Sequence, residues 1–424
     1  MVSWRQKVRD LEEENRFLKE KIEQLEKRLL AYENAHTPPS KSKKKPPKKE
    51  PSGKLGAPLG HQKYEREDPE PTGSVEYVED TCPYCTTKLG KPIETKHILE
   101  EEIPEPQPIE VIDHIINHYE CSKCHKHVVA SNNAPKSRFG KNIHAHVALL
   151  KFEDRLPLRK TMSSLERHYG LTLSNVSVHK INRRVAKKLE PHYKTLICRI
   201  RKANVTYVDE TELKVDGKTY HLWTFVTEIE VLFVIRKSRG PKVIEEILGE
   251  KFQGVICCDG WTAYSSYSSN LQRCWAHILR ESKELAKKYD FFFGFHISLK
   301  DIFEKIKKLR AKPPSLKTRQ SWKEKLTLEL NQIAEQMWAY KEFRTFSTKL
   351  KNGIDYWFTC LINLFVEPTN NIAERALREL IVQRKIMGGL RREEGARIME
   401  VITSVIATTK IEGKPLFRTI RSQL

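Results

Sequence analysis

The sequence predicts a multidomain protein in which a coiled coil and a metal-stabilised module precede an α/β core. Three observations support this fold class: a heptad repeat over residues 4–33, two Cys-x-x-Cys pairs, and strand-like patterning that begins near residue 204. The chain has 424 residues, which exceeds the usual size of a single hydrophobic core. We therefore expect two to four domains.

Residues 1–36 are predicted to form a parallel two-stranded coiled coil. Every seventh position is apolar, at Trp4, Leu11, Leu18, Leu25 and Tyr32. The column three residues before these positions is largely β-branched or polar and contains Asn15, which would fix the register of the two helices. The charges that flank this seam are complementary in all four interhelical pairs. A lone amphipathic helix packed on its own domain is the alternative.

Residues 37–75 are predicted to be an extended basic linker, because they are rich in Pro, Gly and Lys and lack apolar periodicity. Lys43, Lys44 and Lys45 are its candidate DNA contacts. The chain as a whole carries a formal net charge of +21, which favours a nucleic acid as partner, since Lys and Arg on phosphates release counterions. A solubilising tether is the alternative reading of the linker.

Residues 76–130 are predicted to be a zinc ribbon. The candidate ligands of one structural Zn²⁺ are Cys82, Cys85, Cys121 and Cys124. The spacing between the two pairs is long for a ribbon, so His125 or His127 could replace one cysteine. The odd total of nine cysteines favours metal binding in a reducing cytoplasm over a disulfide framework.

Residues 131–200 are predicted to be a helical, helix-turn-helix DNA-binding region. Gly170 makes a sharp turn between two helical patterns over residues 161–188, and Ser174 caps the second helix. The candidate DNA contacts at the start of that helix are Asn175, Ser177, His179 and Lys180. A helical hairpin without a role in DNA binding is the alternative.

Residues 201–269 are predicted to be the first part of the catalytic core. Strands at 204–215 and 218–227 flank a hairpin turn, and a third strand, a helix and a fourth strand at 254–258 follow. This order opens a ribonuclease-H-like fold. A right-handed crossover would place the fourth strand beside the first, and therefore Asp209 near Asp259.

Residues 270–360 are predicted to be a helical insertion, residues 361–410 the second part of the core, and residues 411–424 a C-terminal tail. Cys274 and His277 in the insertion have ligand-like spacing, but a buried helix face is favoured because no second ligand pair is near. Glu374 begins a helix in the second part. The candidate DNA contacts on the same helix are Arg378, Arg384 and Lys385. A solvated face with a Glu–Arg pair is the alternative.

Asp209, Asp259 and Glu374 are the candidate catalytic residues. Carboxylates from separate elements can hold two divalent cations, which activate the attacking oxygen and stabilise the leaving oxygen in phosphoryl transfer. The chain resembles the DDE transposases of the insertion-sequence-66 type over nearly its whole length. The matching motifs include Ser-Arg-Phe-Gly at 137–140, Asp-Glu-Thr at 209–211, Asp-Gly-Trp-Thr-Ala-Tyr at 259–264, Cys-Trp-Ala-His at 274–277 and Asn-Asn-Ile-Ala-Glu-Arg-Ala-Leu-Arg at 370–378.

The resemblance implies a transposase that binds the terminal repeats of its element, cleaves DNA with two Mg²⁺ or Mn²⁺ ions per active site, and joins 3′-hydroxyl ends to target DNA. It also implies a dimer or higher assembly, small companion proteins from the same element, and a prokaryotic cytoplasmic location at the nucleoid. It selects Asp209 over its neighbour Glu210 as the first ligand.

Two other classes of protein stay open at this stage. The first is a DNA-binding regulator with a zinc ribbon and a helix-turn-helix, and the second is a ribonuclease-H-like nuclease or resolvase without strand transfer. A membrane protein is not expected, since no apolar run approaches the roughly 18 residues that span a bilayer. The charged, heptad-patterned N-terminus does not resemble a signal peptide.

Overall fold

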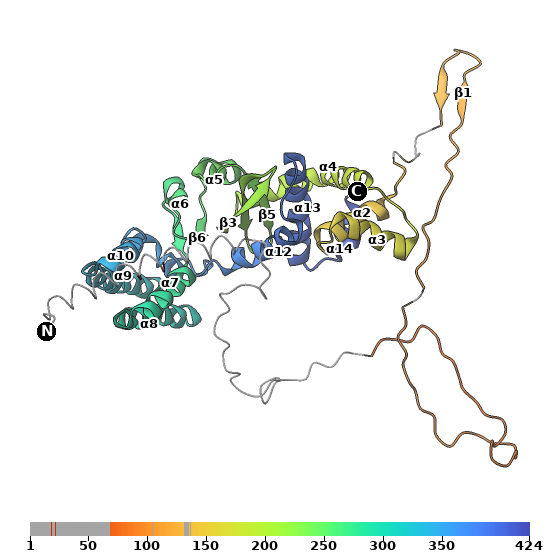
Figure 1. Ribbon diagram of the computed structural model, residues 1–424, viewed down its shortest axis with the longest axis horizontal. Coiled ribbons are helices and arrows are strands. Elements are labelled where there is room, and N and C mark those ends of the chain that lie inside the picture. The colour runs from red at the N-terminus through yellow and green to blue at the C-terminus, as the bar shows by residue number, and fades with distance from the viewer. Residues whose placement is uncertain (1–17, 19–21, 23–67, 104, 131–134, 136) are drawn as a thin grey trace, which may run out of the picture. The chain divides into compact units, whose positions relative to one another are not determined.

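The computed structural model describes residues 18, 22, 68–103, 105–130, 135 and 137–424 (Figure 1). It divides into two units, Met1–Gln107 and Pro108–Leu424. The predicted coiled coil lies outside the described residues except for Leu18 and Ile22, and the predicted linker lies outside them up to residue 67. Lys43, Lys44 and Lys45 are therefore predictions without a structural counterpart.

In the first unit, residues 68–103 and 105–107 form no helix or strand, and their one β-bridge joins Thr81 to Lys88. The second unit contains a small antiparallel hairpin near its start. Its strands are β1 (His118–Glu120) and β2 (His127–Val129). Each Cys-x-x-Cys pair therefore occupies a turn between short extended segments.

The second unit is built on a five-stranded sheet with the strand order β5-β4-β3-β6-β7. The strands are β3 (Val205–Val215), β4 (Lys218–Val226), β5 (Val231–Arg236), β6 (Val255–Cys258) and β7 (Leu271–Arg273). β3 pairs antiparallel with β4 and parallel with β6. The prediction that the fourth core strand lies beside the first is confirmed, and the arrangement is the one expected for a ribonuclease-H-like core.

One face of the sheet is covered by α12 (Asn371–Met387). Ala373, Leu377 and Leu380 of this helix pack in one buried cluster with Tyr207 and Leu213 of β3. Their spacing of three and four residues places them on one side of the helix. The opposite face packs against α4 (Asn175–Ile200), α5 (Pro241–Leu248) and α6 (Thr262–Tyr267).

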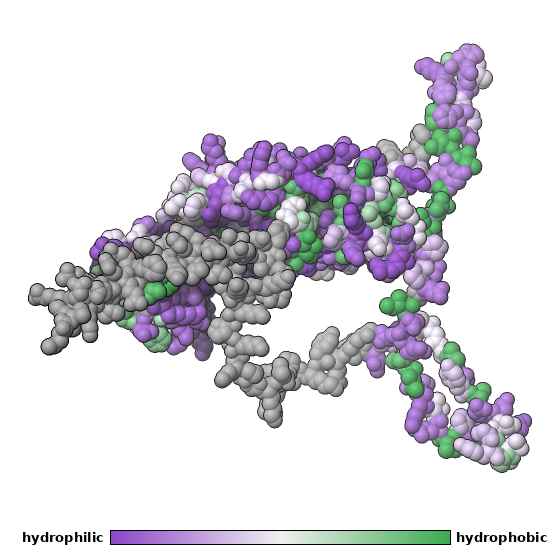
Figure 2. Space-filling view, in the orientation of Figure 1, coloured by the Kyte–Doolittle hydropathy of each residue, from purple (hydrophilic) through white to green (hydrophobic). Residues whose placement is uncertain are grey.

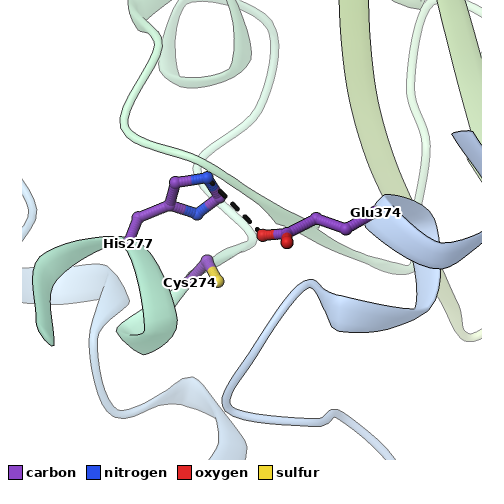
Figure 3. A group of neighbouring side chains, drawn as sticks. All are labelled: Cys274, His277 and Glu374. Carbon is purple, nitrogen blue, oxygen red and sulfur yellow. Dashed lines mark ion pairs between the residues drawn. The ribbon is translucent and has the colours of Figure 1, made fainter. Parts of the chain in front are cut away.

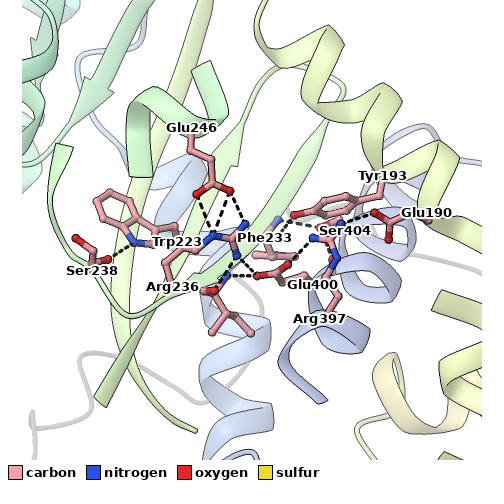
Figure 4. Close-up of polar contacts among 11 residues, drawn as sticks. Glu190, Tyr193, Trp223, Phe233, Arg236, Ser238, Glu246, Arg397, Glu400 and Ser404 are labelled. Carbon is pink, nitrogen blue, oxygen red and sulfur yellow. Dashed lines mark hydrogen bonds and ion pairs between the residues drawn. The ribbon is translucent and has the colours of Figure 1, made fainter. Parts of the chain in front are cut away.

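The edge strand β5 is covered by α13 (Glu393–Ile411), whose polar side chains satisfy the strand backbone (Figure 4). Thr408 Oγ1 accepts from the Val231 N–H at 3.0 Å, and Ser404 Oγ accepts from the Phe233 N–H at 2.8 Å. Glu400 accepts from the next alternate N–H, at Ile235. Side chains four residues apart on α13 thus accept from N–H groups two residues apart on β5. These N–H groups are therefore not available to pair with another strand.

The helical region before the sheet consists of α2 (Lys141–Phe152), α3 (Leu158–Tyr169) and α4. Gly170 has a φ of 61° and ends α3, and the Ser174 side chain caps α4 by accepting from the Ser177 N–H. Both features were predicted. The second helix is longer than the pattern over residues 161–188 indicated, because α4 continues through Pro191 to Ile200.

The predicted insertion is helical, but it begins after β7 rather than at residue 270. Its α-helices are α7 (Trp275–Lys288), α8 (Phe293–Ala311), α9 (Leu316–Trp338), α10 (Arg344–Lys351) and α11 (Thr359–Ile362). They enclose a second hydrophobic core around Trp275 and Trp357. The insertion is therefore a packed subdomain with its own core.

The predicted C-terminal tail contains α14 (Leu416–Ser422), and its Ile420 is fully buried in the main core. Where it is not covered by grey atoms, the face of the sheet and helices seen in Figure 2 is largely hydrophilic. In the described part of the chain, no helix is long and apolar enough to cross a membrane.

Candidate active site

Asp209 lies on β3, and Asp259 directly follows the neighbouring parallel strand β6. Tyr207 of β3 is paired with Cys257 of β6, and each aspartate lies two residues beyond its member of this pair. Side chains two residues apart on a strand point to the same face. Tyr207 and Cys257 belong to the cluster beneath α12, so Asp209 is directed to the side of the sheet from which Glu374 comes.

Asp209 is surrounded by other acids. Burial raises the pKa of Asp209 to about 7, with further contributions from the charges of Glu210, Asp259 and Glu374. A hydrogen bond from the Glu210 backbone N–H to Oδ1, at 3.0 Å, acts in the opposite direction. A buried carboxylate whose pKa is raised by neighbouring acids belongs to a site that gains from a bound dication.

Glu210 points to the opposite face from Asp209, as the alternation of the strand requires. Its carboxylate is only 1% exposed and lies 2.8 Å from the Arg239 guanidinium. The Tyr264 hydroxyl donates to the other carboxylate oxygen. The sequence left the choice between Asp209 and Glu210 to a family resemblance, and the structure distinguishes them by environment: Glu210 is already fully engaged.

The contacts of Glu210 continue to the segment that carries Asp259. The Arg239 guanidinium lies 4.2 Å from the centre of the Trp261 ring, and Trp261 Nε1–H donates to the Arg239 carbonyl at 3.3 Å. Asp259 Oδ1 in turn accepts from the Trp261 backbone N–H at 2.8 Å. Glu210 therefore holds the loop after β6 through Arg239 and Trp261.

Glu374 is placed by the start of α12. Asn370, the residue before this helix, is fully buried, and its Nδ2–H donates to the Val208 carbonyl at 2.8 Å. This bond joins the start of the helix to the residue next to Asp209. Glu374 lies in the first turn of the helix, where the positive end of the helix dipole stabilises a carboxylate.

The ion-pair partners of Glu374 come from α7. Its Oε1 is 3.6 Å from His277 Nε2, and its Oε2 is 3.5 Å from the Arg280 guanidinium. Among the described ion pairs, Glu374 has none with Arg378, so the alternative of a simple Glu–Arg pair along one helix is not what forms. Sequence patterns could not predict this contact, because α7 and α12 are far apart in the chain and meet only in the folded structure.

Cys274, His277 and Glu374 converge on one point (Figure 3). One potential ligand atom from each lies within 4.8 Å of those of the other two. The expectation of a plain buried helix face for Cys274 and His277 is therefore wrong for His277, which faces a carboxylate. The spacing of the two residues was the available signal, and the third member comes from a distant helix.

A pocket of about 630 Å³ opens beside Glu374. Its lining residues are Arg280, Glu367, Thr369, Asn371, Ile372, Glu374, Arg375 and Arg378. Three arginines outnumber the two glutamates in this lining, so the pocket offers cationic groups next to the acidic site. Arg378, one of the predicted DNA contacts, is exposed here.

The other predicted DNA contacts on α12 have different surroundings. Arg384 donates to Thr211 Oγ1 at 3.2 Å and also to the Glu212 carbonyl, so its guanidinium is engaged with β3. We therefore correct the expectation that Arg384 is available to DNA. Lys385 is exposed.

At the start of α4, Asn175 and Lys180 are exposed. The Ser177 backbone N–H is taken up by the helix cap. His179 Nε2 lies 3.2 Å from Glu394 on α13. Of the four predicted DNA contacts on this helix, Asn175 and Lys180 are thus the ones whose side chains face solvent without a partner in another helix.

The two Cys-x-x-Cys turns share one local geometry. The N–H of Thr86 donates to the Cys82 carbonyl and the N–H of His125 donates to the Cys121 carbonyl, each at 2.8 Å. Thr86 and His125 also have positive φ values, 60° and 55°. Cys82 belongs to the first unit and Cys121 to the second, so a shared four-thiolate zinc site stays a prediction.

Two comparisons relate this chain to known proteins. A family model described as "Transposase IS66 family" matches residues 136–398, which include Asp209, Asp259, Cys274, His277 and Glu374. The protein "Uncharacterized protein y4jD" of Sinorhizobium fredii is 24% identical over 304 residues. The aligned region makes up 63% of this chain and 59% of that relative, so the match spans about three fifths of the relative's length.

Proposed function

Because the chain belongs to the IS66 family of transposases, we propose that it is a DDE-type DNA transposase with Asp209, Asp259 and Glu374 as its catalytic carboxylates. The observation that supports this proposal is the placement of Asp209 and of the helix that carries Glu374 on one side of the sheet, with Asp259 after the neighbouring strand. Asp209 lies on β3, Asp259 directly follows β6, and Glu374 lies in the first turn of α12. Burial raises the pKa of Asp209 to about 7, and the charges of Glu210, Asp259 and Glu374 add to this effect.

The three residues fit a pair of hard dications such as Mg²⁺ or Mn²⁺. Carboxylate oxygens are the ligands that these ions prefer. Glu374 Oε1 is buried and has no hydrogen-bond partner among the described residues, which is costly for a carboxylate oxygen unless a cation is bound. When bound, two such ions supply activation of the attacking oxygen and stabilisation of the leaving oxygen during in-line phosphoryl transfer.

The surrounding residues would bind the DNA strand and keep the catalytic carboxylates in position. Arg280, Arg375 and Arg378 line the pocket beside Glu374 and would bind the phosphates on either side of the scissile bond. Glu210, through Arg239 and Trp261, would keep Asp259 in position. Asn370 would fix the distance between Glu374 and β3.

The remaining parts of the chain would serve end recognition. The start of α4, with exposed Asn175 and Lys180, would enter a groove of the terminal repeat, and a zinc-bound module with Cys82, Cys85, Cys121 and Cys124 would extend that contact. Residues 1–36 would pair two chains as a parallel coiled coil and so bring two element ends together.

A single assay separates the proposed function from its rivals. Labelled DNA that carries one end of the element in which this gene lies is incubated with the full chain, a target plasmid and Mg²⁺. A transposase nicks the end and joins it to the plasmid, a nuclease or resolvase releases nicked DNA without joined product, and a regulator only shifts the DNA. Binding without nicking under Mg²⁺ and Mn²⁺ would overturn the proposal.

A further inference from the structure

We propose that Cys274, His277 and Glu374 form a site for Zn²⁺ or another borderline transition-metal ion, next to the proposed Mg²⁺ site and chemically different from it. A thiolate, an imidazole and a carboxylate together select such an ion, whereas Mg²⁺ prefers oxygen ligands alone. The site requires no assumption about DNA chemistry, because it follows from the identity and separation of three ligand atoms.

The separations suit a four-coordinate ion. Zinc binds sulfur at about 2.3 Å and nitrogen or oxygen at about 2.0–2.2 Å, so two ligands at a tetrahedral angle lie roughly 3.4–3.7 Å apart. His277 Nε2 is 3.6 Å from Glu374 Oε1, and all three ligand atoms lie within 4.8 Å of one another.

The Cys274 sulfur lies where backbone N–H groups stabilise a thiolate. Cys274 precedes α7, and the Asn370 N–H at the start of α12 donates to its Sγ at 3.1 Å. Burial raises the pKa of Cys274 overall and the charge of Glu374 adds to this, while the backbone N–H groups of Asn370, His277 and Ala276 act in the opposite direction. A bound dication would offset the negative charges of the Cys274 thiolate and the Glu374 carboxylate, and would therefore favour the thiolate.

Two buried atoms at this point lack a hydrogen-bond partner among the described residues. His277 Nδ1 and Glu374 Oε1 have no hydrogen bond among the described residues, and the 3.6 Å between His277 Nε2 and Oε1 is too long for one. A buried polar atom without a partner is costly and rare in folded proteins. A metal ion coordinated by the imidazole and the carboxylate would satisfy Oε1 directly.

Three protein ligands leave one coordination position open, as in catalytic zinc sites and unlike a zinc ribbon. Glu374 is also one of the proposed ligands of the hard cation, so both sites share this residue. Occupancy by Zn²⁺ would therefore withdraw Glu374 from the Mg²⁺ site. We expect micromolar Zn²⁺ to inhibit Mg²⁺-dependent cleavage; this consequence alone rests on the proposed function.

Metal content of the full-length chain tests the site. Wild-type protein is loaded with Zn²⁺, desalted, and compared with Cys274→Ser and His277→Gln by elemental analysis. Each variant should hold one zinc per chain fewer than the wild type. Cys360→Ser is the matched control, because Cys360 is also a buried cysteine but lies in the core of the insertion. It should keep the wild-type content.

Cobalt identifies the ligand. Co²⁺-loaded wild-type protein should show a sulfur-to-cobalt charge-transfer band, part of which disappears in Cys274→Ser, while His277→Gln weakens Co²⁺ affinity at least tenfold. If Cys274→Ser does not fold, His277→Gln decides alone. Equal zinc content in the wild type and both variants would overturn the site. Asp209→Asn should keep this zinc and lose cleavage, so failure of the metal site and failure of the transposase proposal give different results.

Discussion

The Asn370 side chain donates a hydrogen bond to the Val208 carbonyl across 2.8 Å, and this bond ties the start of α12 to the strand that carries Asp209. Val208 precedes Asp209, and Asn370 lies one helical turn before Glu374. The bond therefore sets how far apart the two proposed metal ligands stand. Asn370 is fully buried, so its side chain acts on the site by fixing the position of α12 relative to β3.

We expect Asn370→Ala to lower DNA cleavage strongly while DNA binding stays near the wild-type level. The substitution leaves the buried Val208 carbonyl unpaired, at a cost of about 1–3 kcal/mol, and releases the start of α12. The test compares the Mg²⁺ dependence of cleavage in the variant and the wild type. A shift to higher Mg²⁺ demand indicates positioning of Glu374, whereas a uniform loss of folded protein would contradict that role.

Asp209→Ala, Asp259→Ala and Glu374→Ala should each reduce cleavage and strand transfer by at least about a thousandfold, the scale seen when one member of a catalytic unit is removed. Each variant loses a ligand of the proposed ion pair, and too little negative charge remains to hold two dications. Binding to element-end DNA should persist, since removal of an acid does not weaken contacts of basic residues with phosphates. Wild-type joining activity in all three variants would exclude the proposed site.

Glu210 offers an internal comparison with Asp209. Glu210→Gln can accept from Arg239 through its one amide oxygen and donate from its NH2 group to the Tyr264 hydroxyl, so it should retain most of the activity. Glu210→Ala leaves Arg239 without its buried partner and should be less stable, by about 1–3 kcal/mol, with cleavage reduced but measurable. Cleavage at different Mg²⁺ concentrations distinguishes the two residues. An inactive Glu210→Gln beside an active Asp209→Asn would show that the first ligand is wrongly assigned.

The Cys-x-x-Cys turns lead to a separate prediction about zinc. Cys82→Ser and Cys124→Ser should each remove one zinc per chain and weaken end-specific DNA binding, because ligation stabilises the module. The content assigned to Cys274 should be unaffected, so a double variant Cys82→Ser and Cys274→Ser should lose two. Elemental analysis together with a DNA-binding titration provides the measurement. Retention of all zinc in Cys82→Ser would exclude the predicted ribbon.

Local patterns were enough to predict the central strands and their neighbours. The hairpin between β3 and β4 was found from Asp216-Gly217, whose φ values of 52° and 71° are both left-handed. β7 was missed, because three residues are too few for an alternating pattern. The extension of α4 was also missed, since Pro191 is an unusual residue inside a helix, although Leu189, Tyr193 and Leu196 keep a helical spacing.

The site shows the same division between local and long-range information. Asp209 and Asp259 could be placed together because a crossover rule relates neighbouring strands. The contact of Glu374 with His277 and Arg280 could not be predicted, because it depends on how the insertion returns to the core. Spacing revealed that Cys274 and His277 could act as ligands, but it could not reveal the third ligand on α12.

The raised pKa of Asp209 predicts that the metal-free protein loses stability as the pH rises, and that bound Mg²⁺ restores it. Unfolded Asp209 ionises near 3.8 and folded Asp209 near 7, so between these values the folded chain binds more protons at this group. The free energy of unfolding therefore falls as the pH rises from about 4 through 7.

Asn cannot ionise, so Asp209→Asn serves as the reference. In metal-free protein we expect the wild type to lose on the order of 1–3 kcal/mol relative to Asp209→Asn between about pH 5 and pH 8, measured by urea unfolding. Mg²⁺ at pH 8 should restore the wild type and leave the variant unchanged. A stability difference that is constant across this pH range, with or without Mg²⁺, would mean that Asp209 does not ionise in the way its acidic surroundings require.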